Sequence, residues 1–282
     1  MSNNLLREEA IQVGEGGRLC GILTSPGALN GRLDTLPLFV FLNAGLLHRV
    51  GPSRLYVLLA RELAGMGFGS VRFDLAGRGD SSPRHELTHQ HSVEADYDEI
   101  LRSLEARFGR LRLVLAGLCS GADNAIRLTL KDPRVVGMVL LDPICFPDDG
   151  FWVRAFWIKY MNVARYIAWL RRRFDALIAP GGKREELADA LGLRDLPSVG
   201  QLQAAFQLIR ERKGRVLSVF TQYALRYYNQ RGQLGRILGV DGYDQFCTEL
   251  FWPHAEHTYR LELHRRQLIE EIKIWAARCV SE

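Results

Sequence analysis

The sequence predicts an α/β fold in which helices flank a mostly parallel sheet. Uninterrupted apolar runs, such as Leu36–Leu42 and Val135–Leu141, are typical of strands that are covered on both faces. Between such runs lie segments with helical periodicity, for example Arg54–Met66, whose leucines at positions 55, 58, 59 and 63 share one side. An alternation of strands and helices indicates right-handed crossovers and parallel pairing.

Two strands at the N-terminus are expected to pair antiparallel, because Glu8–Val13 and Leu19–Thr24 flank a glycine-rich turn. The later elements are predicted, in chain order, as strand Leu36–Leu42, helix Arg54–Met66, strand Ser70–Asp74, helix Ser92–Phe108, strand Leu111–Ala116, helix Ala122–Lys131, strand Val135–Leu141, strand Arg215–Thr221, strand Gln245–Phe251 and helix Leu261–Arg278. Together these segments predict an eight-stranded sheet.

The alternation stops between residues 147 and 212. Phe151–Phe174 has a helical pattern, and further helical segments follow as far as Arg212. We therefore expect residues 147–212 to form a helical cap inserted over the sheet. The core would then consist of residues 1–146 and 213–282.

Composition and charge exclude several classes of protein. Hydrophobic residues make up 47% of the 282 residues and charged residues 24%, which supplies a buried core and excludes a disordered chain. The net charge of +5 is too modest to indicate nucleic-acid binding. The longest apolar runs are too short to span a bilayer, and no signal peptide is visible. Five cysteines without a CxxC motif fit a reducing compartment, so we expect a cytoplasmic protein.

A cysteine flanked by glycines follows the predicted strand Leu111–Ala116 directly. Gly117-Leu118-Cys119-Ser120-Gly121 is a G-x-C-x-G motif, and a helix is predicted to begin at once. Glycines two positions before and after the cysteine allow a sharp, strained turn. Such a turn lifts the cysteine to the carboxyl edge of the sheet, where a helix N-terminus favours a thiolate. A buried structural cysteine in a tight turn is the alternative.

This motif resembles the nucleophile elbow of the α/β-hydrolase superfamily, usually G-x-S-x-G, with cysteine as nucleophile as in the dienelactone hydrolases. The resemblance implies an α/β-hydrolase fold and a catalytic histidine in the loop after the last strand. That loop contains Pro253-His254-Ala255-Glu256-His257-Thr258-Tyr259. His257 matches the histidine by register, whereas His254 is expected to be a surface or supporting residue.

Two backbone amides complete the site that the resemblance implies. In this superfamily one oxyanion-hole N–H comes from the loop that follows the strand corresponding to Leu36–Leu42. The other comes from the residue after the nucleophile. By register these are the amides of Leu46 and Ser120. Each such donor is typically worth about 3–4 kcal/mol to the transition state.

A second resemblance concerns a bacterial branch of the superfamily. The string His48-Arg49-Val50-Gly51-Pro52, the turn from Asp74 to Ser81 and the elbow are similar to those of small hydrolases associated with exosortase and exopolysaccharide systems. This resemblance covers about residues 36–142 and 215–278. In the turn, Asp74 and Arg78 are expected to be structural rather than catalytic.

The acid of a catalytic triad is missing from its usual place after the strand Arg215–Thr221, where Ala224 stands. The other known location is the end of the preceding strand, which Asp142 occupies. We rank Asp142 first as the orienting acid, Glu256 second and the absence of any acid third. Asp142 also fits a purely structural turn before proline. Because a thiol needs less activation than a hydroxyl, a Cys–His pair could act without a strong acid.

The predicted cap carries apolar residues at helical spacing on one face, namely Trp152, Phe156, Tyr160, Val163, Ile167, Leu170 and Phe174. The first interpretation is a helix that buries this face on the domain. The second is an aromatic lid over an acyl pocket, in which Trp152, Phe156, Tyr160 and Tyr223 contact the substrate. The arginines of the cap would then meet an anionic carrier or a membrane headgroup.

Together these features predict an enzyme that cleaves or transfers an acyl group of an ester or thioester. Cys119 would be the nucleophile, His257 the general base and then acid, and Asp142 the orienting acid. The expected partner is a small acyl ester or thioester, free or carrier-bound, with neither nucleic acid nor a transmembrane segment; peripheral membrane contact stays open. No cofactor is expected, and His85, His89 and His91 lack clear metal-ligand geometry. The alternatives are a non-catalytic protein that binds a lipid or partner on the same fold, and a cyclase or acyltransferase that excludes water.

Overall fold

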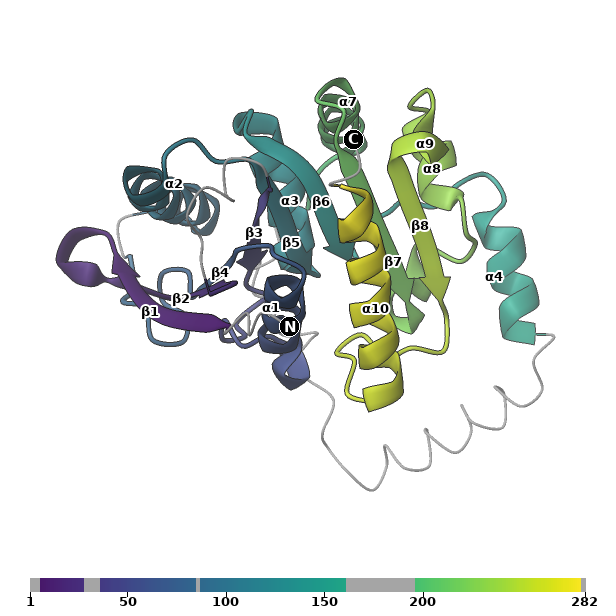
Figure 1. Ribbon diagram of the computed structural model, residues 1–282. Helices are drawn as coiled ribbons and strands as arrows, with labels where there is room; N and C mark the ends of the chain where they lie inside the picture. Colours follow the sequence, from purple (N-terminus) through teal and green to yellow (C-terminus); the bar gives the residue numbers. More distant parts are fainter. Residues whose placement is uncertain (1–5, 28–35, 85–86, 161–195, 280–282) are drawn as a thin grey trace.

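The computed structural model describes residues 6–27, 36–84, 87–160 and 196–279 and contains an eight-stranded sheet (Figure 1). The strands are β1 (Arg7–Val13), β2 (Leu19–Ser25), β3 (Leu38–Leu42), β4 (Ser70–Phe73), β5 (Leu113–Leu118), β6 (Val135–Leu141), β7 (Arg215–Thr221) and β8 (Cys247–Trp252). Their order in the sheet is β1-β2-β4-β3-β5-β6-β7-β8. Pairing is antiparallel for β1–β2 and β2–β4 and parallel for the others. The predicted α/β-hydrolase fold is confirmed.

Helices cover both faces of this sheet. The longer ones are α1 (Leu55–Gly65), α2 (His89–Phe108), α3 (Ser120–Lys131), α4 (Phe151–Tyr160), α7 (Val199–Glu211) and α10 (Glu262–Arg278). The shorter ones are α8 (Gln233–Leu238), α9 (Tyr243–Phe246) and the 3-10 turns η1 (Glu15–Gly17), η2 (Pro52–Arg54) and η3 (Gln222–Arg226). Helices α1 and α10 pack on one face, in front of the sheet in Figure 1, whereas α2, α3 and α7 pack on the other.

The uninterrupted apolar strands fill two separate cores. Successive residues of a strand point to opposite faces of the sheet. In β3, the side chains of Leu38, Val40 and Leu42 accordingly join the core beneath α2, α3 and α7, while Phe39 and Phe41 join the core beneath α1 and α10. Fully burying such a side chain contributes about 1.5–3 kcal/mol. Burial of β3 on both faces, as predicted, therefore helps to hold the sheet and the two layers of helices together.

Several element boundaries differ from the predicted ones for local reasons. Helix α3 begins at Ser120 rather than Ala122, because Cys119 alone makes the turn from β5 into the helix. Strand β8 begins at Cys247 rather than Gln245, because the preceding residues form the single helical turn α9. Neither boundary is marked by a proline or by a break in the apolar pattern.

The two ends of the predicted cap differ in their packing. Helix α4 is anchored by Arg154, which pairs with Asp148 and donates to Asn229 Oδ1 at 2.8 Å. Helix α7 begins with a capping box and buries four apolar side chains in the core that it shares with α3, so it acts as the crossover helix before β7. The stretch between these helices, residues 161–195, lies outside the described residues. The division at residues 146 and 212 thus stays a prediction.

Among the described residues, no helix is both long enough and apolar enough to cross a membrane.

The entry of the chain into β7 provides a test of this packing. A Cβ atom at Gly214 would lie 2.0 Å from the carbonyl oxygen of Val136 on the neighbouring strand, and a strand cannot move aside cheaply. We expect Gly214→Ala to lower the free energy of unfolding by about 1–3 kcal/mol in urea denaturation. At Gly65, at the end of α1, an added Cβ meets nothing within 4 Å, so Gly65→Ala should raise stability by up to about 1 kcal/mol. Equal stabilities of the two variants would contradict the close approach.

Candidate active site

The turn between β5 and α3 holds Cys119 in a strained conformation. Its φ of 55° and ψ of −121° are rare for a residue with a side chain. A Cβ on Gly117 would lie 2.3 Å from the backbone of Gly121, and a Cβ on Gly121 would lie 2.7 Å from the carbonyl oxygen of Leu42. Both glycines of the motif are therefore needed so that three backbone segments can approach one another. The result is a sharp elbow at the carboxyl edge of the sheet.

A histidine and a buried carboxylate meet at the same edge. His257 lies in the loop after β8, and its Nδ1 is 2.6 Å from Oδ2 of Asp142, which directly follows β6. The Asp142 side chain is inaccessible to solvent and also accepts hydrogen bonds from N and Oγ1 of Thr221, both at 2.6 Å. Glu256, the second candidate for the acid, instead pairs with Arg260 at 2.9 Å. Of the candidate acids, Asp142 is the one in contact with His257.

The surroundings of His257 favour its protonated form. Burial alone would lower its pKa, but hydrogen bonds to Asp142 and to Cys119, together with the charges of both groups, raise the pKa from 6.5 to about 9. His257 thus contacts both the candidate nucleophile and the candidate acid. At neutral pH this arrangement stabilises the imidazolium form of His257.

The loop after β3 is attached to the elbow by a hydrogen bond. The backbone N–H of Gly45 donates to Oγ of Ser120 at 2.7 Å, so the Ser120 side chain is engaged by this loop. Leu47 N–H donates to the Ala44 carbonyl and closes a turn that does not use the N–H of Leu46. The N–H of Ser120 lies in the first turn of α3, where a helix has no carbonyl to offer it. Both predicted oxyanion-hole amides thus belong to segments that meet at Cys119.

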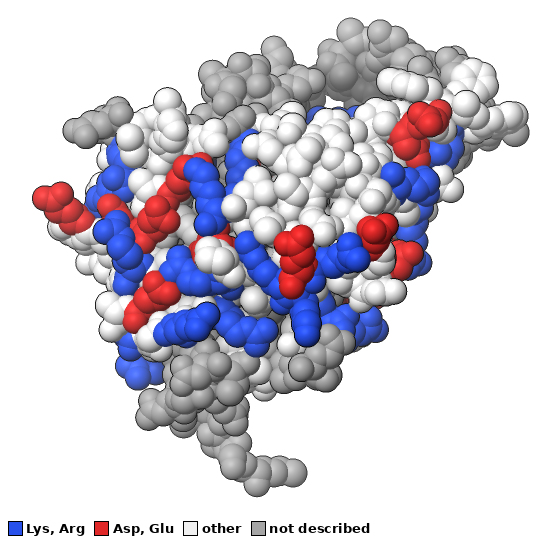
Figure 2. Space-filling model, turned by 90° about the horizontal axis from the view of Figure 1, so that it is seen from above, with Lys and Arg blue, Asp and Glu red and all other residues white. Residues whose placement is uncertain are grey.

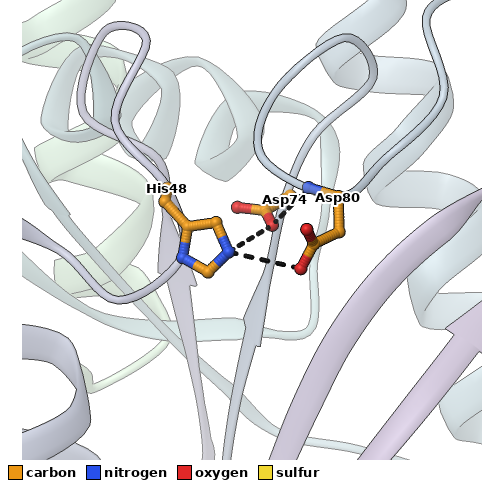
Figure 3. A group of neighbouring side chains, drawn as sticks. All are labelled: His48, Asp74 and Asp80. Carbon is orange, nitrogen blue, oxygen red and sulfur yellow. Dashed lines mark hydrogen bonds and ion pairs between the residues drawn. The ribbon is translucent and has the colours of Figure 1, made fainter.

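Asp74 anchors the same loop, and Figure 3 shows it next to His48 and Asp80. Its buried carboxylate accepts hydrogen bonds from the backbone N–H of Arg49 at 2.5 Å and from Nδ2 of Asn43 at 3.3 Å, and it pairs with the Arg49 guanidinium. Nε2 of His48 lies 3.3 Å from Asp74 and 3.4 Å from Asp80. These contacts tie the loop to the turn after β4, which is the structural role expected for Asp74.

The cluster in Figure 3 has the donor set of a metal site. Ligand atoms of His48, Asp74 and Asp80 lie within 4.8 Å of one another. The guanidinium of Arg49, however, contacts both carboxylates and lies 2.8 Å from Nε2 of His48. An arginine cation therefore already supplies the positive charge that a metal ion would bring, and the donor set does not fit an additional ion.

Of the three histidines between residues 85 and 91, the structure describes the side chain of one. His91 Nδ1 lies 3.0 Å from Oγ1 of Thr88, at the start of α2. His85 and the side chain of His89 lie outside the described part of the chain.

An aromatic ring occupies the place next to the position where the triad acid was expected. Ala224 is fully buried in η3, while the ring of Tyr223 stacks on the His257 imidazole with centroids 4.0 Å apart and an interplanar angle of 21°. The guanidinium of Arg226 lies over the same ring, 4.0 Å from its centroid. Tyr223, predicted to contact substrate, thus also contacts the histidine.

Two aromatic residues on the predicted apolar face of α4 are exposed rather than buried on the domain. Trp152 is 71% exposed and Phe156 is 56% exposed, whereas the neighbouring Phe151 is buried. The first interpretation of this face, burial against the core, is therefore wrong for Trp152 and Phe156. The side chain of Tyr160 lies outside the described residues, as does the predicted continuation of the helix to Phe174.

Two polar residues of the site escaped the sequence analysis. Thr221, the last residue of β7, gives Asp142 two of its hydrogen bonds, and Asn43 links the loop after β3 to Asp74 and to the backbone of Leu75. Thr221 ends β7, the neighbour of β6, which leads to Asp142. Asn43 follows β3, the neighbour of β4, which leads to Asp74. Their position could have been noticed in the sequence, because each is a polar residue at the carboxyl end of a buried parallel strand.

Residues 45–191, more than half of the chain, match the family described as serine aminopeptidase, S33. The chain belongs to the serine aminopeptidase S33 family. It is accordingly a hydrolase of the α/β-hydrolase fold. Whereas the description of the S33 family specifies serine, this member has Cys119 at the centre of its elbow.

Solved structures support the fold of this S33 member. An esterase from Pyrococcus furiosus is 10% identical with a TM-score of 0.59, covering 99% of this chain and 93% of its own. A thioesterase domain from the curacin biosynthetic pathway is 18% identical with a TM-score of 0.52, covering 96% and 100%. A putative dienelactone hydrolase from Klebsiella pneumoniae is 14% identical with a TM-score of 0.54, covering 97% and 99%. No curated protein sequence matches the chain.

The contact between His257 and Asp142 predicts a change in titration. Without the carboxylate, the effect of burial is less opposed, so Asp142→Asn should lower the pKa of His257 from about 9 in an NMR titration of the imidazole. Since the folded pKa is raised, the stability that this contact contributes is fully present below pH 6.5 and is lost as the pH rises through about 9. Glu256→Gln is the matched control and should leave the titration unchanged. The opposite pattern would identify Glu256 as the partner.

Proposed function

We propose that this chain is a cysteine-dependent hydrolase that cleaves acyl esters or thioesters. Cys119 is the nucleophile, His257 the general base and then acid, and Asp142 the residue that orients His257. The backbone amides of Leu46 and Ser120 form the oxyanion hole. The observation that carries the proposal is that His257 contacts both Asp142 and Cys119 at the carboxyl edge of the sheet.

The proposed reaction proceeds through a thioester on the protein. His257 takes the proton of the Cys119 thiol, and Sγ attacks the carbonyl carbon of the substrate. The carbonyl oxygen then carries the negative charge and accepts hydrogen bonds from Leu46 and Ser120, each worth about 3–4 kcal/mol. As the bond to the leaving group breaks, the imidazolium donates its proton to the departing oxygen or sulfur. A water that gives its proton to His257 attacks the acyl-cysteine and releases the carboxylic acid, and the proton returns to Sγ.

Esters and thioesters suit this chemistry better than amides. A thiol leaves readily as a thiolate, and an alcohol leaves once the imidazolium has protonated its oxygen. The carbonyl carbon of an amide is a poorer electrophile for a thiolate. The esterase and the thioesterase domain among the similar structures support the same substrate class. The exposed rings of Trp152 and Phe156, with Tyr160 and Tyr223, are proposed to contact the acyl part of a free or carrier-bound substrate.

A non-catalytic binding role is less well supported. The main support for such a role was the absence of an acid at Ala224. Asp142 contacts His257 instead, so the absence at Ala224 no longer supports it. Acyl transfer to an acceptor other than water uses the same residues and the same acyl-cysteine. The fate of that intermediate therefore distinguishes hydrolysis from transfer.

The cysteine nucleophile fits a reducing compartment. All five cysteines are free, including the partly exposed Cys119, and a thiol nucleophile must stay reduced to act. We therefore propose that this enzyme is cytoplasmic. We also propose that it belongs to the bacterial branch of small hydrolases associated with exosortase systems, with cysteine as nucleophile. The elbow and the string from His48 to Pro52 support that branch.

Intact-protein mass spectrometry tests the proposed function. The protein is incubated with a panel of activated esters, acyl thioesters and, because of the family description, an amino-acid anilide. We expect an acyl adduct on the wild type that is absent from Cys119→Ala and forms at least about 100-fold more slowly in His257→Ala. Cys145→Ala, at a buried thiol, should label like the wild type. An adduct or full turnover that persists in Cys119→Ala sinks the assignment, whereas decay of the adduct in water indicates hydrolysis.

The stack between Tyr223 and His257 gives a separate prediction. Such a ring contact is worth about 0.5–1.5 kcal/mol, so Tyr223→Ala should slow alkylation of Cys119 by iodoacetamide about tenfold at neutral pH. Tyr223→Phe keeps the ring and should react within about twofold of the wild type. The label is assigned to Cys119 by peptide mass spectrometry. Equal rates in the Ala variant and the wild type would mean that the stack does not position His257.

A further inference from the structure

The positive charge of this protein is concentrated in three short segments. Residues 107–112, 131–134 and 210–215 lead into β5, β6 and β7 and contain nine lysines and arginines but two acidic residues. This excess of seven positive charges is larger than the excess of five in the whole chain. The remainder of the chain is therefore net negative by two.

The three segments lie side by side in space. Strands β5, β6 and β7 are adjacent and parallel, so their starts share one edge of the sheet, at the top of Figure 1. Figure 2 looks down on that end and shows more Lys and Arg than Asp and Glu side chains. Cys119 and His257 lie at the opposite, carboxyl edge of the same strands. A ligand at the basic edge would leave the proposed catalytic edge open.

Two of these cations, Arg134 and Arg212, stabilise the fold through hydrogen bonds. Arg134 forms two hydrogen bonds with Asp132, at 2.8 and 2.9 Å, and pairs with Glu105 at 2.5 Å. Arg212 donates to the carbonyl oxygens of Asp132 and Val135, both at 2.9 Å. These two arginines hold the edge together and are already neutralised or engaged.

Other cations of the edge are available to a ligand. Within the described part of the chain, Arg110, Arg112, Arg210 and Lys213 have no carboxylate partner. Basic residues are favoured at helix C-termini, which accounts for Arg210 in the last turn of α7. Arg112 stands directly before β5 rather than in a helix, so this preference does not account for it.

A cleft at this edge brings the free arginines together. It has a volume of about 560 Å³ and is lined by Arg110, Leu111, Arg112, Pro133, Arg134 and Val136. Arg110 and Arg112 are exposed on either side of Leu111, which is 1% exposed and forms part of an apolar floor. A guanidinium matches the geometry of phosphate oxygens through paired N–H donors. An apolar floor below two such groups suits a phosphate that carries an organic part.

We propose that this cleft is a binding site for the phosphate group of an organic phosphate. Arg110 and Arg112 contact the phosphate oxygens, Arg134 keeps the cleft in shape through Asp132, and Leu111 and Val136 contact the organic part. The remaining cations of the edge extend the attractive field around the cleft. The site is independent of the proposed reaction at Cys119.

Binding of two phosphate sources tests this site. Adenosine monophosphate, with pyrophosphate as the purely inorganic comparison, is titrated by calorimetry at low salt. In parallel, phosphatidylcholine vesicles with and without phosphatidylglycerol are tested by co-sedimentation. Binding of the nucleotide identifies a soluble phosphate ester as the source, and binding of the anionic vesicles alone identifies a lipid headgroup. In either case affinity should fall as salt is added.

Single-charge variants make the assignment specific. Arg110→Gln and Arg112→Gln should each weaken binding about fivefold, and the double variant roughly 25-fold, as expected for one cation each near phosphate. Arg231→Gln removes an exposed arginine without a described partner from the loop before α8 and should bind within about twofold of the wild type. Thermal unfolding checks that all variants keep the fold. Absence of binding to both sources overturns the proposal, as does equal weakening by Arg231→Gln.

Discussion

A carboxylate that has no access to water, that of Asp142, is the constraint on which the candidate site depends. An unpaired buried charge is costly, and here Thr221 and His257 satisfy it with three short contacts. Those partners come from the end of β7 and from the loop after β8, so they are present only if both strands are correctly placed. The same contacts favour the imidazolium and fix the imidazole next to Cys119. The chemistry of the site therefore depends on the correct order of the last three strands.

The other half of the site depends on a second buried carboxylate. Asp74 holds the loop after β3 through Arg49 and Asn43, and the bond from Gly45 to Ser120 fastens that loop to the elbow. Polar groups are therefore gathered at the carboxyl ends of the parallel strands. The opposite ends carry the surplus of arginine and lysine, so a single sheet has two chemically different edges. This division lets a ligand at one edge leave the other accessible.

Much of the fold could be predicted because burial on both faces leaves a clear pattern in the sequence. The apolar runs predicted the central strands, and the glycines around Cys119 predicted the elbow. The start of β8 was missed because the turn α9 before it has no distinct periodicity, and the exposure of Trp152 and Phe156 was missed because spacing does not say what a helix face meets. Asp142 was one of three possibilities for the acid, since spacing cannot measure a contact between residues 115 positions apart.

The fold class, the strained turn at Cys119 and the register that points to His257 could all be predicted from the amino-acid sequence alone. These are local properties, since they depend on side-chain alternation and on the conformational freedom of glycine. The contact between Asp142 and His257, the stacking of Tyr223 on the imidazole and the shared edge of the three basic segments became visible in the three-dimensional arrangement. Those facts depend on which strands are neighbours, and that choice arises from the packing of the whole sheet rather than from any short stretch of chain.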